Sequence, residues 1–524
     1  MNNIIFILLF YCVYSKLVKN ILVVIFPGGK NKNSLMIDLF NYSIEKSEKY
    51  DIYYHIIIHE SENDIFHNKK YNNINLLPYG SNDFDIEKID IDDIEKKPIF
   101  KFYQIKLRKF YQEFLDSEIL NTIKNNIYDM IISDRPNFIF YLLQKELKIK
   151  QKLYLSLRPL PQLFYNNIEL NYNYIPILGS DNINIMDYSE RTFNFFSSYS
   201  EKFINFLSNY EIKYLFNDYG FKYIKSNIDI LDCFILIQYP IGITFPLKIP
   251  FNVKLLNSIT LDLYDHNYLI SFNKDFYNFI QTYKNIIVFS KDIFFFVEKY
   301  IIELIINDYL IDEENQIGFL FINNNENIKL NNTLTVKIKE DEYYKFLNQI
   351  LKIKQISLLI TPSNFNEITN SIYFKKPILS FGNGIYQKNI NGYIKRNMLG
   401  IIIKENEKAN YKNIINSINK LIQSNNDEFE NDNIYIKNAI RVSNILKNGK
   451  NPFEEYLKWI NYGFEIGYQN LELNLYERNN EIFFYNAIII IIIFIISISI
   501  LKFFLNKYIF NKNQKTNKTK LKNE

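Results

Sequence analysis

Residues 357–367 read Ser-Leu-Leu-Ile-Thr-Pro-Ser-Asn-Phe-Asn-Glu. The apolar run that ends at Ile360 predicts a buried strand, and the residues after it predict a helix with Thr361 as N-cap and Pro362 at its first position. A helix that begins at the carboxyl end of a parallel strand presents free N–H groups and the positive end of its dipole. Such a junction can hold a phosphate, although every α/β repeat contains one.

Strands and helices alternate on both sides of this junction. In the second half of the chain, strands are expected at 286–289, 317–322 and 357–360, and helices at 295–307 and 343–354. In the first half, strands are expected at 21–26, 52–59, 130–133, 152–157 and 234–238, and helices at 34–48, 101–125 and 137–147. The alternation favours an α/β fold with parallel sheets, in two similar halves that face one cleft. We place their connection near residues 265–284.

Length and charge limit the function classes. The 524 residues exceed what one hydrophobic core usually organises, so two domains are expected. The chain carries 61 basic and 57 acidic residues, a net charge of +4, and nothing in this balance indicates nucleic-acid binding. Cys12 falls in the presumed signal, which leaves Cys233 without an intramolecular disulfide partner in the mature chain. The chain has four histidines and no cysteine cluster, so the sequence does not indicate a metal site with His or Cys ligands.

Both ends of the chain carry sorting features. Residues 482–501 are uncharged and mostly apolar, which predicts a single transmembrane helix. Seven lysines and one glutamate follow it, so residues 502–524 are expected to form a basic cytosolic tail with the body on the other side. Residues 1–15 read as a signal peptide, the alternative being a buried strand or helix. Acceptor sequons at Asn41 and Asn331 lie on the predicted lumenal side. Two lysines near the end resemble a dilysine retrieval signal.

Several segments together resemble the UDP-glycosyltransferase family, the membrane-anchored glucuronosyl- and glucosyltransferases. The resemblance covers almost the whole chain. The segments that match the donor-sugar signature are 346–349, 358–366, 372–373, 376–378, Gln387 and 397–400. Residues 174–176 and 187–191 look like the acceptor-domain segment, residues 245–253 like the stretch that leads to the linker, and residues 456–460 like the start of the C-terminal layout.

The resemblance implies a GT-B fold, with two Rossmann-like domains and a C-terminal transmembrane helix. It implies a hexosyltransferase that moves a hexose or hexuronic acid from a UDP-sugar to a hydroxyl of a small lipophilic or lipid acceptor. The reaction would invert the anomeric carbon without a metal, with the UDP-sugar as co-substrate and no other cofactor. The expected location is the endoplasmic reticulum membrane, single-pass type I, with the body in the lumen and homo-oligomers possible.

The resemblance also implies a histidine after the first strand that removes the acceptor proton, held by an aspartate. Asp134 matches the aspartate. The histidine position falls on Lys32, with Lys30 or Asn31 if the loop shifts. A lysine has an unperturbed pKa of about 10.4, and a nearby carboxylate would raise it further, so Lys32 would hold its proton. The alternative for Lys32 and Asp134 is a loop ion pair or two unrelated charges. Histidines 55 and 59 fall on the second strand, where a histidine is more often structural.

On the donor side, the family's Thr-His-Gly-Gly motif reads Thr361-Pro362-Ser363-Asn364 here, and its ribose-binding acid reads Asn370. The donor-binding candidates are Ser290, Gln349, Thr361, Ser363, Asn364, Asn366 and Gln387. Alternatively, Asn366 caps a helix or faces solvent, and the two glutamines are surface amides.

These expectations divide the chain into six parts: signal peptide 1–15, acceptor domain 16–270, UDP-sugar domain 271–450, helical segment 451–481, transmembrane helix 482–501 and tail 502–524. The alternative to an active enzyme is a GT-B pseudoenzyme that binds a glycan, lipid or protein partner in the lumen. A third reading, an anchored structural protein, does not account for residues 346–400.

Overall fold

The structure is a computed structural model, and its described residues belong to two units, Met1–Leu471 and Glu472–Glu524. In the first unit it describes residues 16–26, 30–62, 73–81, 99–134, 137–157, 210, 212–222, 233–244, 251–262, 274–291, 293–311, 317–322, 330–339, 342–382, 385–408, 410–422 and 433–471. In the second unit it describes Lys502.

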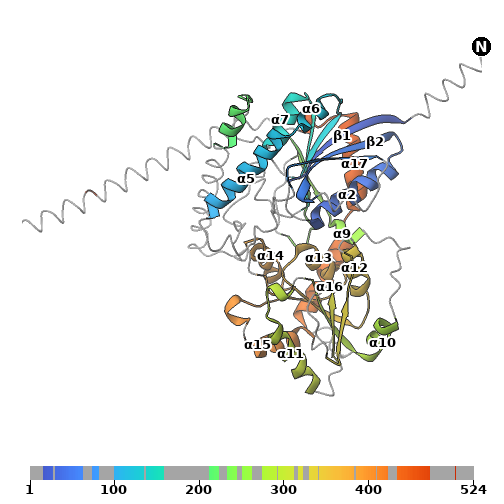
Figure 1. The fold of residues 1–524 in the computed structure, drawn as a ribbon. Helices are drawn as coiled ribbons and strands as arrows, with labels where there is room; N and C mark the ends of the chain where they lie inside the picture. Colours follow the sequence, from blue (N-terminus) through green and yellow to red (C-terminus); the bar gives the residue numbers. More distant parts are fainter. Residues whose placement is uncertain are drawn as a thin grey trace, which may run out of the picture. The chain divides into compact units, whose positions relative to one another are not determined.

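The first sheet, which includes the strands β1 and β2 labelled in Figure 1, is parallel throughout. Its strand order among the described residues is β3-β2-β1-β4-β5-β6-β7. Its strands are β1 (Leu17–Val24), β2 (Tyr50–His59), β3 (Ile74–Tyr79), β4 (Met130–Ser133), β5 (Gln151–Ser156), β6 (Phe234–Gln238) and β7 (Val253–Leu256). The helices of this half are α2 (Lys30–Lys46), α5 (Ile99–Asp116), α6 (Ile119–Lys124), α7 (Phe138–Glu146) and α9 (Ile259–Asp262), with the 3₁₀ turn η1 (Glu60–Glu62).

Both faces of the first sheet are covered, which explains the continuous apolar runs of its strands. In β1, Ile21 and Val23 pack in one apolar cluster with residues of α2. Leu22 and Val24 point to the other face and pack with residues of α5 and α7. The period of two along a strand therefore distributes one apolar run between two cores.

The second sheet is also parallel, with the order β10-β9-β8-β11-β12-β13. Its strands are β8 (Asn285–Phe289), β9 (Ile317–Ile322), β10 (Thr333–Val336), β11 (Ile356–Thr361), β12 (Ile378–Ser380) and β13 (Gly400–Ile402). Its helices are α10 (Lys274–Thr282), α11 (Lys299–Ile311), α12 (Tyr343–Leu351), α13 (Phe365–Tyr373), α14 (Ile385–Arg396), α15 (Tyr411–Ile422) and α16 (Ile434–Lys447), with 3₁₀ turns η3 (Ile293–Phe295) and η5 (Glu405–Glu407).

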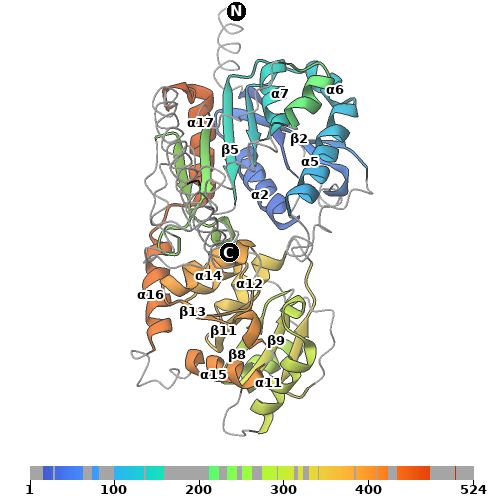
Figure 2. The ribbon, with the colours of Figure 1, turned by 90° about the vertical axis from the view of Figure 1, so that its left-hand side faces the viewer.

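The helix α17 (Pro452–Glu465) follows the second sheet in sequence but packs on the first, as Figure 2 shows. Its Tyr456 is fully buried, and the Tyr456 hydroxyl lies 3.2 Å from that of Tyr54 in β2. Trp459 packs against Phe234 of β6, with ring centroids 4.9 Å apart. The turn η6 (Gln469–Leu471) ends the first unit. One apolar cluster of this unit contains residues of both sheets.

The predicted α/β architecture with two parallel sheets is confirmed, and β4, β6 and β9 have the predicted bounds. The predicted helix start at Thr361 and Pro362 is wrong. Thr361 ends β11, and Ser363 has a φ of 67°, which a right-handed helix excludes. The helix α13 therefore begins at Phe365 with Asn364 as its N-cap.

The transmembrane helix in the predicted architecture needs correction. Within the described part of the chain, every helix is too short or too polar to cross a bilayer. The predicted span 482–501 lies outside the described residues, as do the predicted signal peptide and the tail apart from Lys502. The architecture that the structure supports is the two-sheet fold alone. The predicted domain boundaries and lumenal location stay predictions.

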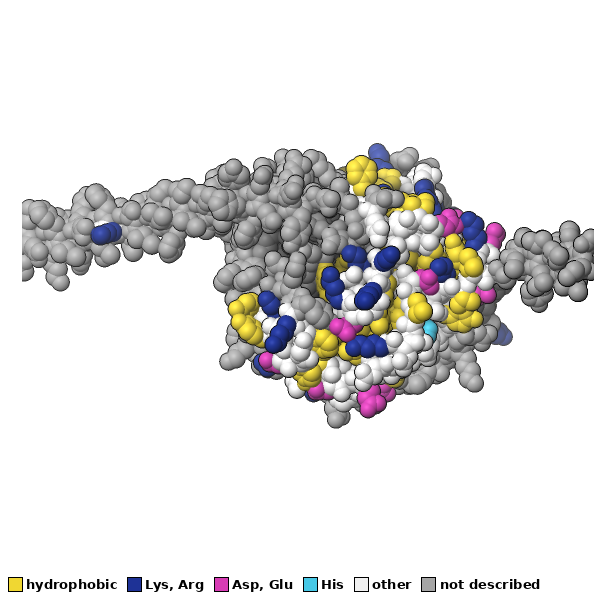
Figure 3. Space-filling model, turned by 90° about the horizontal axis from the view of Figure 1, so that it is seen from above, with side chains coloured by type: hydrophobic (Ala, Val, Ile, Leu, Met, Phe, Trp, Pro, Cys, Tyr) yellow, Lys and Arg dark blue, Asp and Glu magenta, His cyan; other side chains and the backbone are white. Residues whose placement is uncertain are grey.

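The surface drawn in Figure 3 carries lysine and arginine side chains among apolar and acidic ones. This mixture agrees with the small net charge of +4.

Candidate functional site

Asp134 lies at the carboxyl edge of the first sheet, the edge where the carboxyl ends of its parallel strands meet. It follows β4 and is 5% exposed, and its Oδ1 accepts a hydrogen bond of 2.9 Å from the backbone N–H of Phe26, which follows β1. Because β1 and β4 pair through Val24 and Ser133, Asp134 fixes the start of the β1–α2 loop.

Lys32 is the third residue of α2, and Lys30 and Asn31 precede it in the same first turn. The side chains of these three residues lie outside the described part of the structure. The pairing of Lys32 with Asp134 therefore stays a prediction.

Ser290 and Thr361 are adjacent at the carboxyl edge of the second sheet. The backbone N–H of Ser290, which follows β8, donates to the carbonyl oxygen of Ile360 in β11 at 2.9 Å. Both side chains are buried, with 2% of Ser290 and none of Thr361 exposed. The parallel pairing of β8 with β11 therefore places two predicted donor-site residues side by side.

A buried carboxylate, Glu367, lies beside them. Thr361 Oγ1 donates to it at 2.5 Å and the Tyr343 hydroxyl at 2.7 Å. Burial raises the pKa of Glu367 above its ordinary value, and the hydrogen bonds from Thr361 and Tyr343 and the charge of Lys291 oppose this rise. The site therefore holds a carboxyl group whose charge is costly to bury.

Lys291 supplies the positive charge of this site. It is 8% exposed and follows Ser290 directly, and its Nζ lies 5.1 Å from the ring centroid of Tyr343. Sequence reasoning missed Lys291, Tyr343 and Glu367 as site residues. A charged residue two positions after the end of a buried strand, as Lys291 is after β8, was the available signal.

The amino end of α13 is capped by its own chain, because Asn364 Oδ1 accepts from the N–H of Asn366 at 3.1 Å. Ser363 Oγ bonds inward, to Ser380 and at 2.8 Å to Oδ1 of Asn391. A Cβ added to Gly382 would lie 2.6 Å from Ser363 Oγ and 2.7 Å from Cγ of Gln387. Ser363 and Gln387 therefore flank the same glycine.

Two further donor-site positions, Asn366 and Asn370, contact residues of the first half of the chain. Gln238 Nε2, at the end of β6, donates to Asn366 Oδ1 at 2.8 Å. Thr260 Oγ1 in α9 donates to Asn370 Oδ1 at 2.6 Å, and both of these residues are fully buried. Asn370, at the position of the family's ribose-binding acid, therefore ties α9 to α13.

Gln349 lies apart from this group. Tyr343 and Tyr344 begin α12 beside Glu367 and Asn364, whereas Gln349 comes six residues after Tyr343. At about 1.5 Å of rise per residue, this separation is about 9 Å along the helix axis.

Solved structures that are similar to this chain in fold include glycosyltransferases. No protein-family model and no curated protein matches the chain. The spinosyn rhamnosyltransferase SpnG has a TM-score of 0.53 and 11% identity over 84% of this chain and 100% of its own. A variant of Os79 from O. sativa in complex with UDP has a TM-score of 0.53 and 11% identity over 85% and 100%. The glycosyltransferase of kitacinnamycin has a TM-score of 0.52 and 10% identity over 85% and 99%.

The chain thus has the two-sheet GT-B fold of these enzymes over their full length. At 10–11% identity this likeness concerns the fold alone.

Proposed function

We propose that this protein is a glycosyltransferase that takes a sugar from a UDP-sugar and transfers it to a hydroxyl group of a small acceptor. The finer proposal is a hexose or hexuronic acid as the sugar and a lipophilic or lipid acceptor. The acceptor oxygen attacks the anomeric carbon as UDP leaves, so the configuration inverts.

The observation that carries this proposal is the polar group at the carboxyl ends of β8 and β11. Ser290, Lys291 and the amino end of α13 lie together there. A cation and a helix amino end both stabilise the negative charge of a diphosphate. They would do so in the bound UDP-sugar and also as UDP leaves. The fold adds support, because a solved relative in fold, Os79, is in complex with UDP and deoxynivalenol-3-glucoside.

A second candidate function is ligand binding without transfer. It is favoured by the hydrogen bonds of Asn366 to Gln238 and of Asn370 to Thr260, which occupy two donor-site positions. It is also favoured by Glu367, because a carboxylate near the amino end of α13 opposes a diphosphate when it is charged. The alternative protein is a GT-B pseudoenzyme with a glycan, lipid or protein partner.

The test is the midpoint of thermal unfolding of the full chain with UDP, with ADP and without nucleotide. A ligand at about 100 times its Kd stabilises the folded state by about 2.7 kcal/mol, which shifts the midpoint by several degrees. We expect a shift with millimolar UDP that exceeds the shift with ADP. No shift with UDP would refute the donor site, whereas UDP binding without UDP-sugar turnover would favour the pseudoenzyme.

A further inference from the structure

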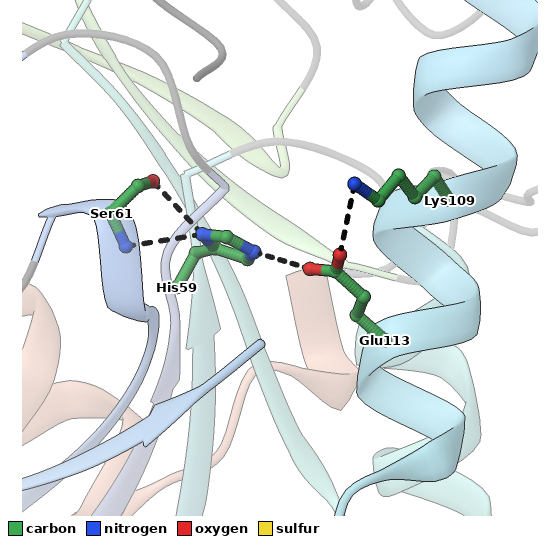
Figure 4. Close-up of polar contacts among 4 residues, drawn as sticks. All are labelled: His59, Ser61, Lys109 and Glu113. Atoms are coloured by element: carbon green, nitrogen blue, oxygen red, sulfur yellow. Dashed lines mark hydrogen bonds and ion pairs between the residues drawn. The ribbon is translucent and has the colours of Figure 1, made fainter. Parts of the chain in front are cut away.

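His59 is held in one orientation by residues of the helix α5 and the turn η1 (Figure 4). It ends β2 and is fully buried. Its Nε2 lies 2.8 Å from Oε2 of Glu113 in α5, and its Nδ1 lies 2.9 Å from Oγ of Ser61 in η1. Lys109, one turn before Glu113, lies 3.6 Å from the other carboxylate oxygen.

These contacts define which ring nitrogen carries the proton. Nδ1 of His59 accepts a hydrogen bond from the backbone N–H of Ser61, so in the neutral imidazole Nε2 carries the proton and donates to Glu113. Both the hydroxyl and the backbone N–H of Ser61 point to Nδ1, the latter at 3.3 Å. The imidazole is therefore a base with its free electron pair directed at the Ser61 hydroxyl.

Exposure differs along this chain of groups. His59 is fully buried, the Glu113 side chain is 17% exposed, and Ser61 is partly exposed. Of His59 and Ser61, Ser61 is therefore the residue that solvent reaches. An ordered base with a carboxylate behind it and a hydroxyl in front has the geometry of nucleophile activation in enzymes.

The backbone next to His59 and Glu113 has a glycine, Gly80, where a side chain would not fit. Gly80 has a φ of 83°, and a Cβ added there would lie 2.4 Å from His59 Nε2 and 2.7 Å from Glu113 Oε2. Tyr79 meets the imidazole edge to face, with centroids 5.3 Å apart. The titratable groups near the imidazole include Glu113, Tyr79 and, through Glu113, Lys109, and Glu60 is the next residue along the chain.

The pair lies near Phe26, which follows β1. The strand β2 pairs with β1 through Ile57 and Val24, so His59 and Phe26 both lie just beyond the paired residues, at the same carboxyl edge. The ring of Phe110 lies 6.3 Å from that of His59 and 4.6 Å from that of Phe26. The N–H of Phe26 is the donor to Asp134.

We propose that His59, oriented by Glu113 and acting through Ser61, is the base for the acceptor hydroxyl, in place of Lys32. This proposal rests on the proposed function. The acceptor proton passes to Ser61 Oγ as the Ser61 proton passes to His59 Nδ1. The acceptor oxygen bonds to the anomeric carbon, and the bond from that carbon to the diphosphate oxygen breaks with its electron pair leaving on UDP. Glu113 stabilises the imidazolium until solvent removes its proton.

The experiment measures UDP release from UDP-glucose, UDP-galactose and UDP-glucuronic acid by the full chain, with water as acceptor, from pH 5 to 9. The variants are His59→Gln, Ser61→Ala and Glu113→Gln, and UDP binding and thermal midpoints are measured for each. The matched control is His55→Gln, because His55 lies on the same strand and its ring contacts Tyr128.

We expect kcat to fall about 100-fold in His59→Gln and at least about tenfold in Ser61→Ala, with KM for the UDP-sugar unchanged. The dependence of kcat on pH should differ from that of the wild type in His59→Gln and in Glu113→Gln, because each variant removes one member of the relay. His55→Gln should behave as the wild type. Because Ser61 is partly exposed, Ser61→Ala tests the relay even if His59→Gln fails to fold.

Each remaining outcome overturns the proposal in a recognisable way. UDP release that is equal in the wild type and the Ser61 and His59 variants would overturn the relay and leave the glycosyltransferase standing. UDP binding without release by the wild type would likewise overturn the relay. Absence of UDP binding would overturn the proposed function, and the relay as a part of it.

Discussion

At the scale of single residues, Glu367 is the feature of the donor site that most needs explanation. Its carboxyl group is 1% exposed and lies near the amino end of α13, where a diphosphate would bind. Burial raises its pKa, so lowering the pH toward its pKa removes the charge that opposes an anion.

We therefore expect Glu367→Gln to bind UDP more tightly than the wild type at pH 8, by about fivefold, since about 1 kcal/mol of repulsion is removed. The difference should narrow as the pH falls, because the wild-type carboxyl then becomes neutral. Titration calorimetry measures the Kd of UDP for both proteins at several pH values. The ratio of the two Kd values is independent of the protonation of UDP itself, because that protonation affects both proteins equally. A constant difference would mean that Glu367 does not face the diphosphate.

Lys291→Met should have the opposite effect and weaken UDP binding about tenfold at pH 8, because the cation is lost while the stem is kept. Lys352→Met is the control. Lys352 is an exposed lysine at the carboxyl end of α12, whereas Lys291 lies by Tyr343 at the amino end of that helix. Equal losses in the two variants, measured by the same calorimetry, would place the diphosphate elsewhere.

Gly80 allows a sharp test of how the His59 pair is held. Gly80 and Gly220 both have positive φ, 83° and 89°, but a Cβ at Gly220 would meet nothing within 4 Å. Each alanine variant should lose about 1 kcal/mol to backbone strain, and Gly80→Ala at least about 2 kcal/mol more from its clash with His59. Urea unfolding followed by Trp459 fluorescence measures both. Equal losses of unfolding free energy in the two variants would show that His59 and Glu113 can move to accommodate the added Cβ.

Single residues were the hardest level to predict from sequence. Spacing placed Ser290 and Thr361 at strand ends, because strand periodicity is local information. It did not reveal that Asn370 bonds to Thr260, since 110 residues separate them and only the tertiary fold brings them together. Similarly, the sequence did not reveal that His59 contacts Glu113, which lies 54 residues away.

At the scale of elements, α13 connects the two sheets. Its Asn370 accepts from Thr260 in α9, and Asn348 in α12 donates to the carbonyl oxygen of Thr260 at 2.7 Å. The three elements therefore meet at one fully buried threonine.

Thr260→Val should lower the free energy of unfolding by about 1–3 kcal/mol, because Asn370 loses the hydroxyl donor in a buried site. The control is Thr369→Val, since Thr369 is equally buried but its hydroxyl bonds within α13, to Phe365 at 2.9 Å. That variant should lose less than about 1 kcal/mol. Urea denaturation gives both values, and equal losses would deny Thr260 its linking role.

Element boundaries were predictable where a strand is buried on both faces, as in β4, β6 and β9. The start of α13 was not, because the Thr-Pro pair gives a strong local capping signal. The positive φ of Ser363 overrides that signal, and the Ser363 hydroxyl is anchored by Ser380 and Asn391. Tertiary hydrogen bonds therefore moved the helix start by several residues.

At the scale of the first unit, α17 returns the chain from the second sheet to the first. It follows the second sheet in sequence and buries Tyr456 against the first. The alternation of strands and helices predicted the two sheets, whereas the return of α17 rests on contacts across about 400 residues, such as Tyr54 to Tyr456.

The central claim is that UDP binds at the carboxyl ends of β8 and β11. Backbone hydrogen exchange of the full chain, with and without UDP, tests it most directly. The account predicts slower exchange on adding UDP in two peptides, one that covers Ser290 and Lys291 and one that covers residues 361–367. Unchanged exchange in both peptides at saturating UDP, or protection confined to other parts of the chain, would contradict it.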